Sequence, residues 1–176
     1  METKQILSGI AGLLFIVAFV PYIRAILRHE TKPAKTSWLI WASLDTITLA
    51  GMFVKHAVNG QILGAVMGSW AVLALVLKYG QGGWTMLDKF CLGGAVLGVV
   101  LWQALHNPVL AIMTSLSVVL LGSIPTFVNA YSNPKGENRT AWTIYFISCV
   151  VALFAVPKWT LEDAAQPITF LRPAAS

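Results

Sequence analysis

The sequence predicts an all-α, polytopic helical membrane protein with two parallel three-helix repeats joined by a linker helix, six full spans and an incomplete or short seventh. Of its 176 residues, 57% are hydrophobic and 11% are charged, whereas soluble domains carry roughly 25% charged residues. Two further observations carry this prediction. Segments 21–41 and 125–145 match at an offset of 104 residues, and four stretches contain no Asp, Glu, Lys or Arg: 5–23, 56–77, 90–134 and 140–157.

Each expected helix is an apolar run long enough to cross a membrane. A span needs about 20 mostly apolar residues, and its backbone must satisfy its own hydrogen bonds. The first run is too long for the apolar part of a secretory signal, so we expect it to be a permanent helix. The glycine-rich segment 80–83 and the polar turn 106–108 break the later runs. The expected spans are 6–27, 37–54, 61–79, 87–105, 109–131 and 141–156.

The internal repeat divides the chain into a first three-helix unit (1–80), a linker with the fourth helix (81–107) and a second unit (108–176). Its offset carries the first helix onto the fifth, an even number of spans away, so both copies cross the membrane in the same direction. The third helix of the second unit is expected from residue 165, yet residues 164–176 reach only about 20 Å as a helix. Either this helix is truncated, or the chain has six spans and a tail, and a second copy in a homo-oligomer would then complete the unit.

Basic residues predict the orientation, because cytoplasmic loops retain Lys and Arg. Eight of the twelve lie in or beside the first, third and fifth loops: Arg24, Arg28, Lys32, Lys35, Lys78, Lys89, Lys135 and Arg139. We therefore expect the N-terminus outside and the repeated loops in the cytoplasm. The small size favours a bacterial inner membrane, with the lipid bilayer as the main partner.

Several function classes have no support in the sequence. No basic stripe with interleaved aromatic residues suggests a nucleic-acid partner. Cys91 and Cys149 lie in apolar runs, where we expect small packing residues rather than a disulfide or a metal site. The three histidines lie in loops without companion ligands, and no catalytic cluster is visible. We expect no enzyme activity, no metal and no cofactor.

The two repeat copies share a proline near the end of an apolar run, a polar basic loop and a Thr-x-Trp start to the next run. The prolines are Pro21 and Pro125. On these features the chain resembles the PQ-loop superfamily, whose members include SWEET and SemiSWEET sugar transporters and lysosomal cystine and cationic amino-acid exporters. The glutamine of that motif is replaced by Tyr22 and Thr126. The resemblance implies a transporter whose two prolines act as hinges, and the structural alternative is a tolerated proline near each helix end.

Asp45 is the acidic residue well inside an expected span, in the second helix. A carboxylate there costs free energy unless it is paired, hydrated or protonated, which makes it a functional hypothesis by default. We expect it to bind a substrate hydroxyl or amine, or to carry a proton for coupling. The structural alternative is a carboxyl group bonded to Thr48 or Ser43 on its own helix.

Aromatic residues near the starts of the second and sixth helices supply candidate gates. Trp41 and Tyr145 lie one turn inside these helices, whereas Trp38 and Trp142 are expected to anchor at the lipid headgroups. The other candidates for binding substrate or a proton are Thr48, Ser69, Trp70, Asn129 and Cys149. The leading function is a transporter or facilitator of a small polar solute, such as a sugar or amino acid, by alternating access between the repeats. The alternative is a non-transporting binding, receptor or assembly protein of the same fold.

Overall fold

The computed structural model describes residues 2–80, 85–105, 108–132 and 137–174, which form helices and connecting loops. This confirms the predicted all-α class. The elements are α1 (Glu2–Leu27), α2 (Lys35–Val54), α3 (Gly60–Tyr79), α4 (Met86–Leu105), α5 (Pro108–Ser132), α6 (Arg139–Ala155) and α7 (Leu161–Ala174). Their bounds lie within a few residues of the expected spans, except that α1 begins one turn earlier.

Three helices in the described part of the chain are long and apolar enough to cross a membrane, namely α1, α2 and α3. Their outward faces carry large apolar side chains that a soluble protein would bury. Leu13 on α1 is 62% exposed, and Met67 on α3 is 66% exposed. Helix α6 is also apolar but has only 17 residues. Such apolar outer faces suit contact with the hydrocarbon of a lipid bilayer.

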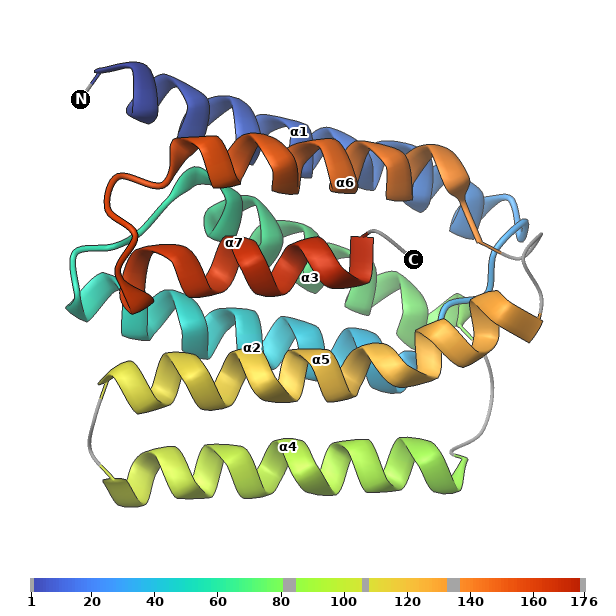
Figure 1. Cartoon of the computed structure of the whole chain (residues 1–176). Coiled ribbons are helices and arrows are strands. Elements are labelled where there is room, and N and C mark those ends of the chain that lie inside the picture. Colours follow the sequence, from blue (N-terminus) through green and yellow to red (C-terminus); the bar gives the residue numbers. More distant parts are fainter. Residues whose placement is uncertain (1, 81–84, 106–107, 133–136, 175–176) are drawn as a thin grey trace.

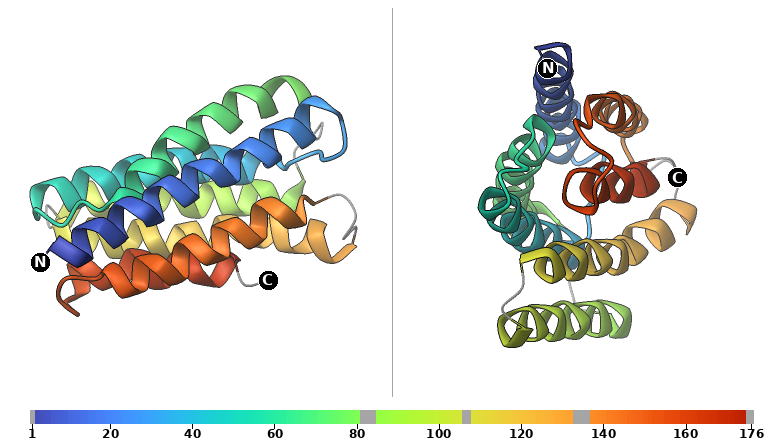
Figure 2. Two further views of the ribbon diagram at one scale, coloured as in Figure 1. Left: turned by 90° about the horizontal axis from the view of Figure 1, so that it is seen from above. Right: turned by 60° about the vertical axis from the view of Figure 1, so that its left-hand side comes forward.

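The helices run side by side along a common direction (Figure 1). Helix α1 packs against α3 and α6, and α2 packs against α3 and α5. Helix α7 lies against both α5 and α6, while α4 covers the outer side of α5 (Figure 2). The bundle therefore closes through α1, α3, α2, α5, α7 and α6, and the interior that these helices enclose holds the candidate site.

The short helix α7 begins at the same end of the bundle as the N-terminus and ends partway along it (Figure 1). Its 14 residues span about 21 Å at 1.5 Å per residue, less than the hydrocarbon core of about 30 Å. Ala164, Gln166 and Phe170 are buried against the other helices. Residues 161–174 therefore fold into the bundle as a short helix.

Close contact between α1 and α3 depends on glycine. A side chain at Gly12 would collide with the backbone of Gly60, and one at Gly64 would meet the backbone of Gly12. At Gly68 the space is filled by the ring of Phe19. Small residues allow membrane helices to approach in this way, so the glycines of α3 position its polar side chains close to α1.

Two histidines lie in the turns directly after α1 and α2. His29 has a φ of 58° and His56 a φ of 53°, in the left-handed region. The amide of Glu30 donates to the carbonyl of Ala25, and the amide of Ala57 donates to that of Met52, each over 2.9 Å. These bonds satisfy carbonyl groups that the helix ends leave unpaired. The sequence analysis gave these residues no role, because left-handed caps usually carry glycine.

Candidate functional site

A cavity of about 70 Å³ lies inside the bundle, and its lining comes from α1, α2, α3, α5, α6 and α7. We call it the central cavity. It brings together five residues that the sequence marked as candidates: Asp45, Ser69, Trp41, Tyr145 and Cys149. They come from α2, α3 and α6, so the packing of these helices makes one site from positions up to about a hundred residues apart.

Asp45 supplies the negative charge of the central cavity. It is only 5% exposed, and its side chain hydrogen-bonds to Ser69 on the neighbouring helix α3. The predicted partner Thr48 is not used, because its hydroxyl oxygen has no hydrogen-bond partner among the described residues. None of the described residues lining the cavity is Lys, Arg or His. An ionised Asp45 therefore has no counter-ion in this lining, which is a costly arrangement in a membrane interior.

Aromatic rings form much of the cavity wall. The ring centroids of Trp38 and Trp41 are 5.1 Å apart, and those of Trp142 and Tyr145 are 5.7 Å apart. The ring of Phe15 lies 4.9 Å from that of Tyr145. Trp38 is only 4% exposed, so the expectation that it anchors at the headgroups is wrong: its ring packs inward against those of Phe19 and Tyr22 on α1.

The two candidate gate residues differ in their polar atoms. Trp41 donates its indole Nε1–H to the carbonyl of Val119 on α5 over 3.3 Å. Tyr145 is 4% exposed, and its hydroxyl has no hydrogen-bond partner among the described residues. A buried hydroxyl without a partner costs roughly 1–3 kcal/mol. Tyr145 therefore presents an unsatisfied polar group in a wall that is otherwise mostly apolar.

Some lining residues are spaced at the offset that separates the two matching sequence segments. Four pairs of lining positions are 104 residues apart: Phe15 and Val119, Trp38 and Trp142, Trp41 and Tyr145, and Asp45 and Cys149. The last three pairs fall in or near the matching segments, whereas Phe15 and Val119 share no side-chain chemistry.

A network of amide side chains contacts the lining of the central cavity through Cys149. We call Asn59, Gln61 and Gln166 the amide network. Gln166 donates its Nε2–H to Oε1 of Gln61 over 3.0 Å, and Asn59 donates to Oε1 of Gln166 over 2.8 Å. Gln61 in turn donates to the sulfur of Cys149 over 3.2 Å. Both glutamines are fully buried, so these bonds replace the water that the amides would otherwise need.

Beyond the amide network lies a larger cavity of about 680 Å³, which we call the polar vestibule. Its lining includes Lys4, His56, Lys158 and Asp163, together with Gln61. Lys4 donates to the carbonyl of Val156 over 2.6 Å and to that of Pro157 over 3.1 Å, which ties α1 to the loop before α7. Gln61 lines the vestibule and contacts Cys149 of the central cavity, so the amide network lies between the two cavities.

The amide network was not predicted from the sequence. Gln61 and Gln166 are polar residues in helical segments, which is a visible signal, but they lie about a hundred positions apart and nothing local pairs them. Their partnership depends on the entry of α7 between α5 and α6. The two prolines near Gln166 hid that helix, since proline usually argues against a helix interior.

Of four further candidates, two lie outside the described lining of the central cavity and two have side chains outside the described residues. Thr48 is buried but is not among the described lining residues. Trp70 is 49% exposed and donates its Nε1–H to Thr46 over 3.0 Å, on the outer surface of α2 and α3. The side chain of Asn129 lies outside the described residues, as does that of the second hinge candidate, Pro125.

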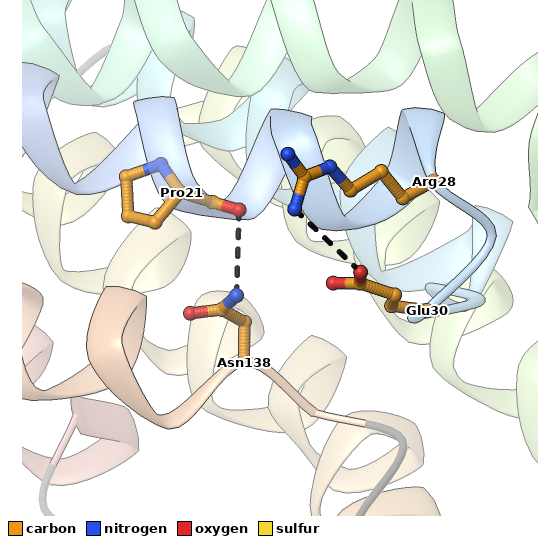
Figure 3. Close-up of polar contacts among 4 residues, drawn as sticks. All are labelled: Pro21, Arg28, Glu30 and Asn138. Atoms are coloured by element: carbon orange, nitrogen blue, oxygen red, sulfur yellow. Dashed lines mark hydrogen bonds and ion pairs between the residues drawn. The ribbon is translucent and has the colours of Figure 1, made fainter.

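Pro21, the first hinge candidate, lies inside α1. Its carbonyl accepts a hydrogen bond of 3.3 Å from Nδ2 of Asn138 (Figure 3). Oδ1 of Asn138 in turn accepts from the amide of Ala141 at the start of α6. Nearby, the exposed side chains of Arg28 and Glu30 form an ion pair with 3.9 Å between Nη1 and Oε1, and such a pair adds little to stability. One asparagine therefore both caps α6 and contacts the proline-containing turn of α1.

The described residues contain no group of three or more His, Cys, Asp or Glu side chains placed to hold a metal ion. The described lining of the central cavity offers one carboxylate, two hydroxyl groups, a thiol and several aromatic rings. Comparisons of the chain with protein-family models, with curated proteins and with solved structures find no match.

Proposed function

We propose that the chain is a membrane transporter or facilitator of a small polar solute, working by alternating access between two three-helix units. The packing pattern supports two equivalent units. Helix α3 lies between α1 and α2, as α7 lies between α5 and α6. The units meet through α1 with α6 and through α2 with α5, and exchanging the two units converts one of these contacts into the other. Helix α4 is the linker.

The observation that carries the proposal is a lone buried carboxylate in a cavity between these units. Asp45 is buried with no basic residue among the described lining residues. A protein that only needed stability would replace such a group by an apolar one. Ionisable residues inside membrane proteins mark substrate and ion pathways for this reason.

Both ends of the central cavity have barriers that a transport cycle requires. The amide network separates it from the polar vestibule. Toward the other end, Trp38 and Trp142 lie one to two helical turns closer than Asp45 and Cys149 to the starts of α2 and α6. The cavity of about 70 Å³ is smaller than a typical ligand pocket, so alternating access requires the units to separate when a solute enters.

A hinge at Pro21 gives the units a place to bend. Proline breaks one hydrogen bond of its helix, and kinks in long helices are concentrated at such positions. The contact from Asn138 joins this turn of α1 to the first turn of α6, across the proposed units. Rocking of one unit against the other would stretch or break this bond.

Solute uptake into proteoliposomes tests the proposal. The intact chain is compared with Asp45→Asn, Pro21→Ala and the exposed-loop control Glu30→Gln, over a panel of sugars, amino acids and amines. We expect at least one solute to accumulate faster than in empty liposomes, and Asp45→Asn to lower that rate at least about tenfold, or about 1.4 kcal/mol. Glu30→Gln is expected to keep the wild-type rate. Uptake at the empty-liposome rate for the whole panel would contradict a carrier.

One observation favours the second candidate, a non-transporting binding protein. Helix α7 is too short to span the membrane, so the second unit has only part of the third helix that a closed carrier needs. For that protein the same panel would show solute-induced stabilisation of the native state in detergent without uptake. The two candidates therefore differ in a single readout, flux.

A further inference from the structure

The lining of the central cavity has one kind of formal charge. Asp45 is the acidic residue in it, and the described lining contains no Lys, Arg or His. A neutral ligand would leave an ionised Asp45 uncompensated inside the bundle, and an anionic ligand would add repulsion. A cation is the ligand whose charge removes the cost of burying this carboxylate.

The rest of the lining distinguishes an organic cation from a metal ion. Six aromatic side chains line the cavity, namely Phe15, Phe19, Trp38, Trp41, Trp142 and Tyr145. Hard inorganic cations require about six oxygen ligands, whereas the described lining offers only the carboxylate of Asp45 and the hydroxyls of Ser69 and Tyr145. Aromatic rings instead attract ammonium groups, and Trp does so best.

The lining also argues against sugars and amino acids. A sugar brings many hydroxyl groups, most of which would be buried unpaired against aromatic walls, at a substantial cost for each. An amino acid brings a carboxylate, and the described lining has no cationic side chain to receive it. The ligand best matched to these walls is a cation with an apolar body and at most one or two hydrogen-bonding groups.

Tyr145 supplies an independent indication of a ligand. Its hydroxyl is buried and has no partner among the described residues, and the residue belongs to the lining of the central cavity. It lies on α6, while Asp45 lies on α2 of the other proposed unit. A ligand bearing one hydroxyl or N–H group beside its charge would satisfy Tyr145 and Asp45 together, and would thereby contact both units.

We propose that the central cavity binds a small organic cation without a carboxylate, an alkylammonium compound, with its charge at Asp45 and its alkyl groups among the rings of Trp41 and Tyr145. This inference rests on the transporter proposal, because it names the solute class of the same site. It adds a role for the aromatic wall, which excludes water and attracts the cationic head, and it makes Asp45 the residue that selects charge.

A binding comparison on the unmodified chain tests charge selection without any variant. Choline is the probe, and its uncharged isostere 3,3-dimethylbutan-1-ol, with the same shape and hydroxyl, is the matched control. Binding is measured by calorimetry in detergent. We expect choline to bind at least about tenfold more tightly than the isostere, since a buried ion pair and cation–π contacts are both lost. Equal affinities, or tighter binding of glucose or lysine than of choline, would overturn the proposal.

Variants then assign the residues. Asp45→Asn is expected to abolish the preference for choline over the isostere, whereas Glu30→Gln keeps it. Trp41→Leu is expected to weaken choline binding more than Trp41→Phe, which retains a ring. Each variant is first checked for an unchanged helical spectrum and elution volume. A folded Asp45→Asn chain that still prefers choline at least tenfold, or a Trp41→Leu chain with wild-type affinity, would contradict the assignment.

Uptake of radiolabelled choline separates this inference from the transporter proposal. Choline that binds selectively but does not enter proteoliposomes would support the cation site and contradict transport. Glucose or leucine uptake that choline neither shares nor inhibits would support transport and contradict the cation site. Competitive, Asp45-dependent choline uptake would support both.

Discussion

Asp45 combines the proposed binding role with a stability cost. It is buried, hydrogen-bonded to Ser69, and has no counter-ion among the described lining residues. Removal of one member of a buried ion pair is destabilising because the other charge is left unpaired. Asp45 is already in that unpaired state before a ligand binds, so its substitution should relieve a cost rather than create one.

We therefore predict that Asp45→Asn raises the thermal stability of the ligand-free protein in detergent by a few degrees while it removes uptake. The amide has nearly the same shape and can still hydrogen-bond to Ser69, but it carries no charge to bury. The measurement is a thermal unfolding curve of both chains at the same detergent concentration, with Glu30→Gln as the surface control. A marked fall in stability would instead show that the carboxylate is a structural partner that holds α2 to α3.

Trp41 and Tyr145 use their polar atoms differently. They lie 104 residues apart, at the offset of the matching sequence segments, and line the same cavity. Trp41 uses its donor on the backbone of Val119, while the hydroxyl of Tyr145 has no partner among the described residues. One residue of the pair thus holds two helices together, and the other is free to contact a ligand. This asymmetry suits a site in which only one unit contributes a charge.

At the scale of elements, the amide network joins helices that are distant in sequence. Gln61 begins α3 and Gln166 lies in α7, and their bond carries the contact between these two helices near the vestibule. Asn59 connects to the same network and also caps α3, since its Oδ1 accepts from the amide of Ile62 over 3.0 Å. Buried networks of this kind stabilise only when every member has a partner.

A double-mutant cycle tests this coupling. Gln166→Leu leaves the Oε1 of Gln61 without its donor and should cost roughly 1–3 kcal/mol of unfolding free energy. Gln61→Leu should cost a similar amount, but the double variant should cost clearly less than the sum, because both polar partners are then gone. Denaturant unfolding in mixed micelles gives the three values. Strict additivity would mean that the two glutamines are not energetically coupled.

The turns after α1 and α2 contain a backbone conformation that their residues rarely adopt. Each turn has a histidine in the left-handed region, where glycine is the usual residue. The bonds that close each turn compensate for part of the strain. The resulting turn directs the chain from α2 into α3, so that Asn59 and Gln61 arrive beside α1 and α7.

At the scale of the whole molecule, the two halves of the chain meet through two pairs of helices, and exchanging the halves would convert one pair into the other. Helix α1 meets α6, and α2 meets α5. The central cavity lies where these contacts converge, with Asp45 and Cys149 at equivalent positions. Rocking about such an interface would change the cavity and the polar vestibule together, because Gln61 belongs to the vestibule lining and contacts the cavity lining.

The proposed orientation gives a direct prediction about exposure. Basic loops stay in the cytoplasm, so the loop that contains Glu30 should be inside and the α2 to α3 connection should be outside. A cysteine at Lys55 should react with a membrane-impermeant maleimide in intact cells, and a cysteine at Glu30 only after permeabilisation. The unsubstituted chain, whose Cys149 is buried, measures background labelling. The opposite pattern would reverse the orientation and place the polar vestibule in the cytoplasm.

Much of the fold could be predicted from the sequence because the membrane imposes simple conditions. Apolar length and the segregation of charge predicted the helices close to their observed bounds, and the lone acid in the second helix led to Asp45. The prediction that failed concerns direction, because Trp38 faces the cavity rather than the headgroups. Of the two alternative partners of Asp45 on its own helix, Thr48 is not used, since its hydroxyl has no hydrogen-bond partner among the described residues.

Local length and hydropathy were enough to predict which segments are helices, because backbone buried in hydrocarbon must satisfy its own hydrogen bonds. What these helices enclose could be seen only from their packing. Side-chain partners such as Gln61 and Gln166, or Asp45 and Ser69, come from packing between segments that no local pattern connects. The folding of residues 161–174 into α7 also depended on the groove between α5 and α6, since an isolated helix with two prolines would not persist.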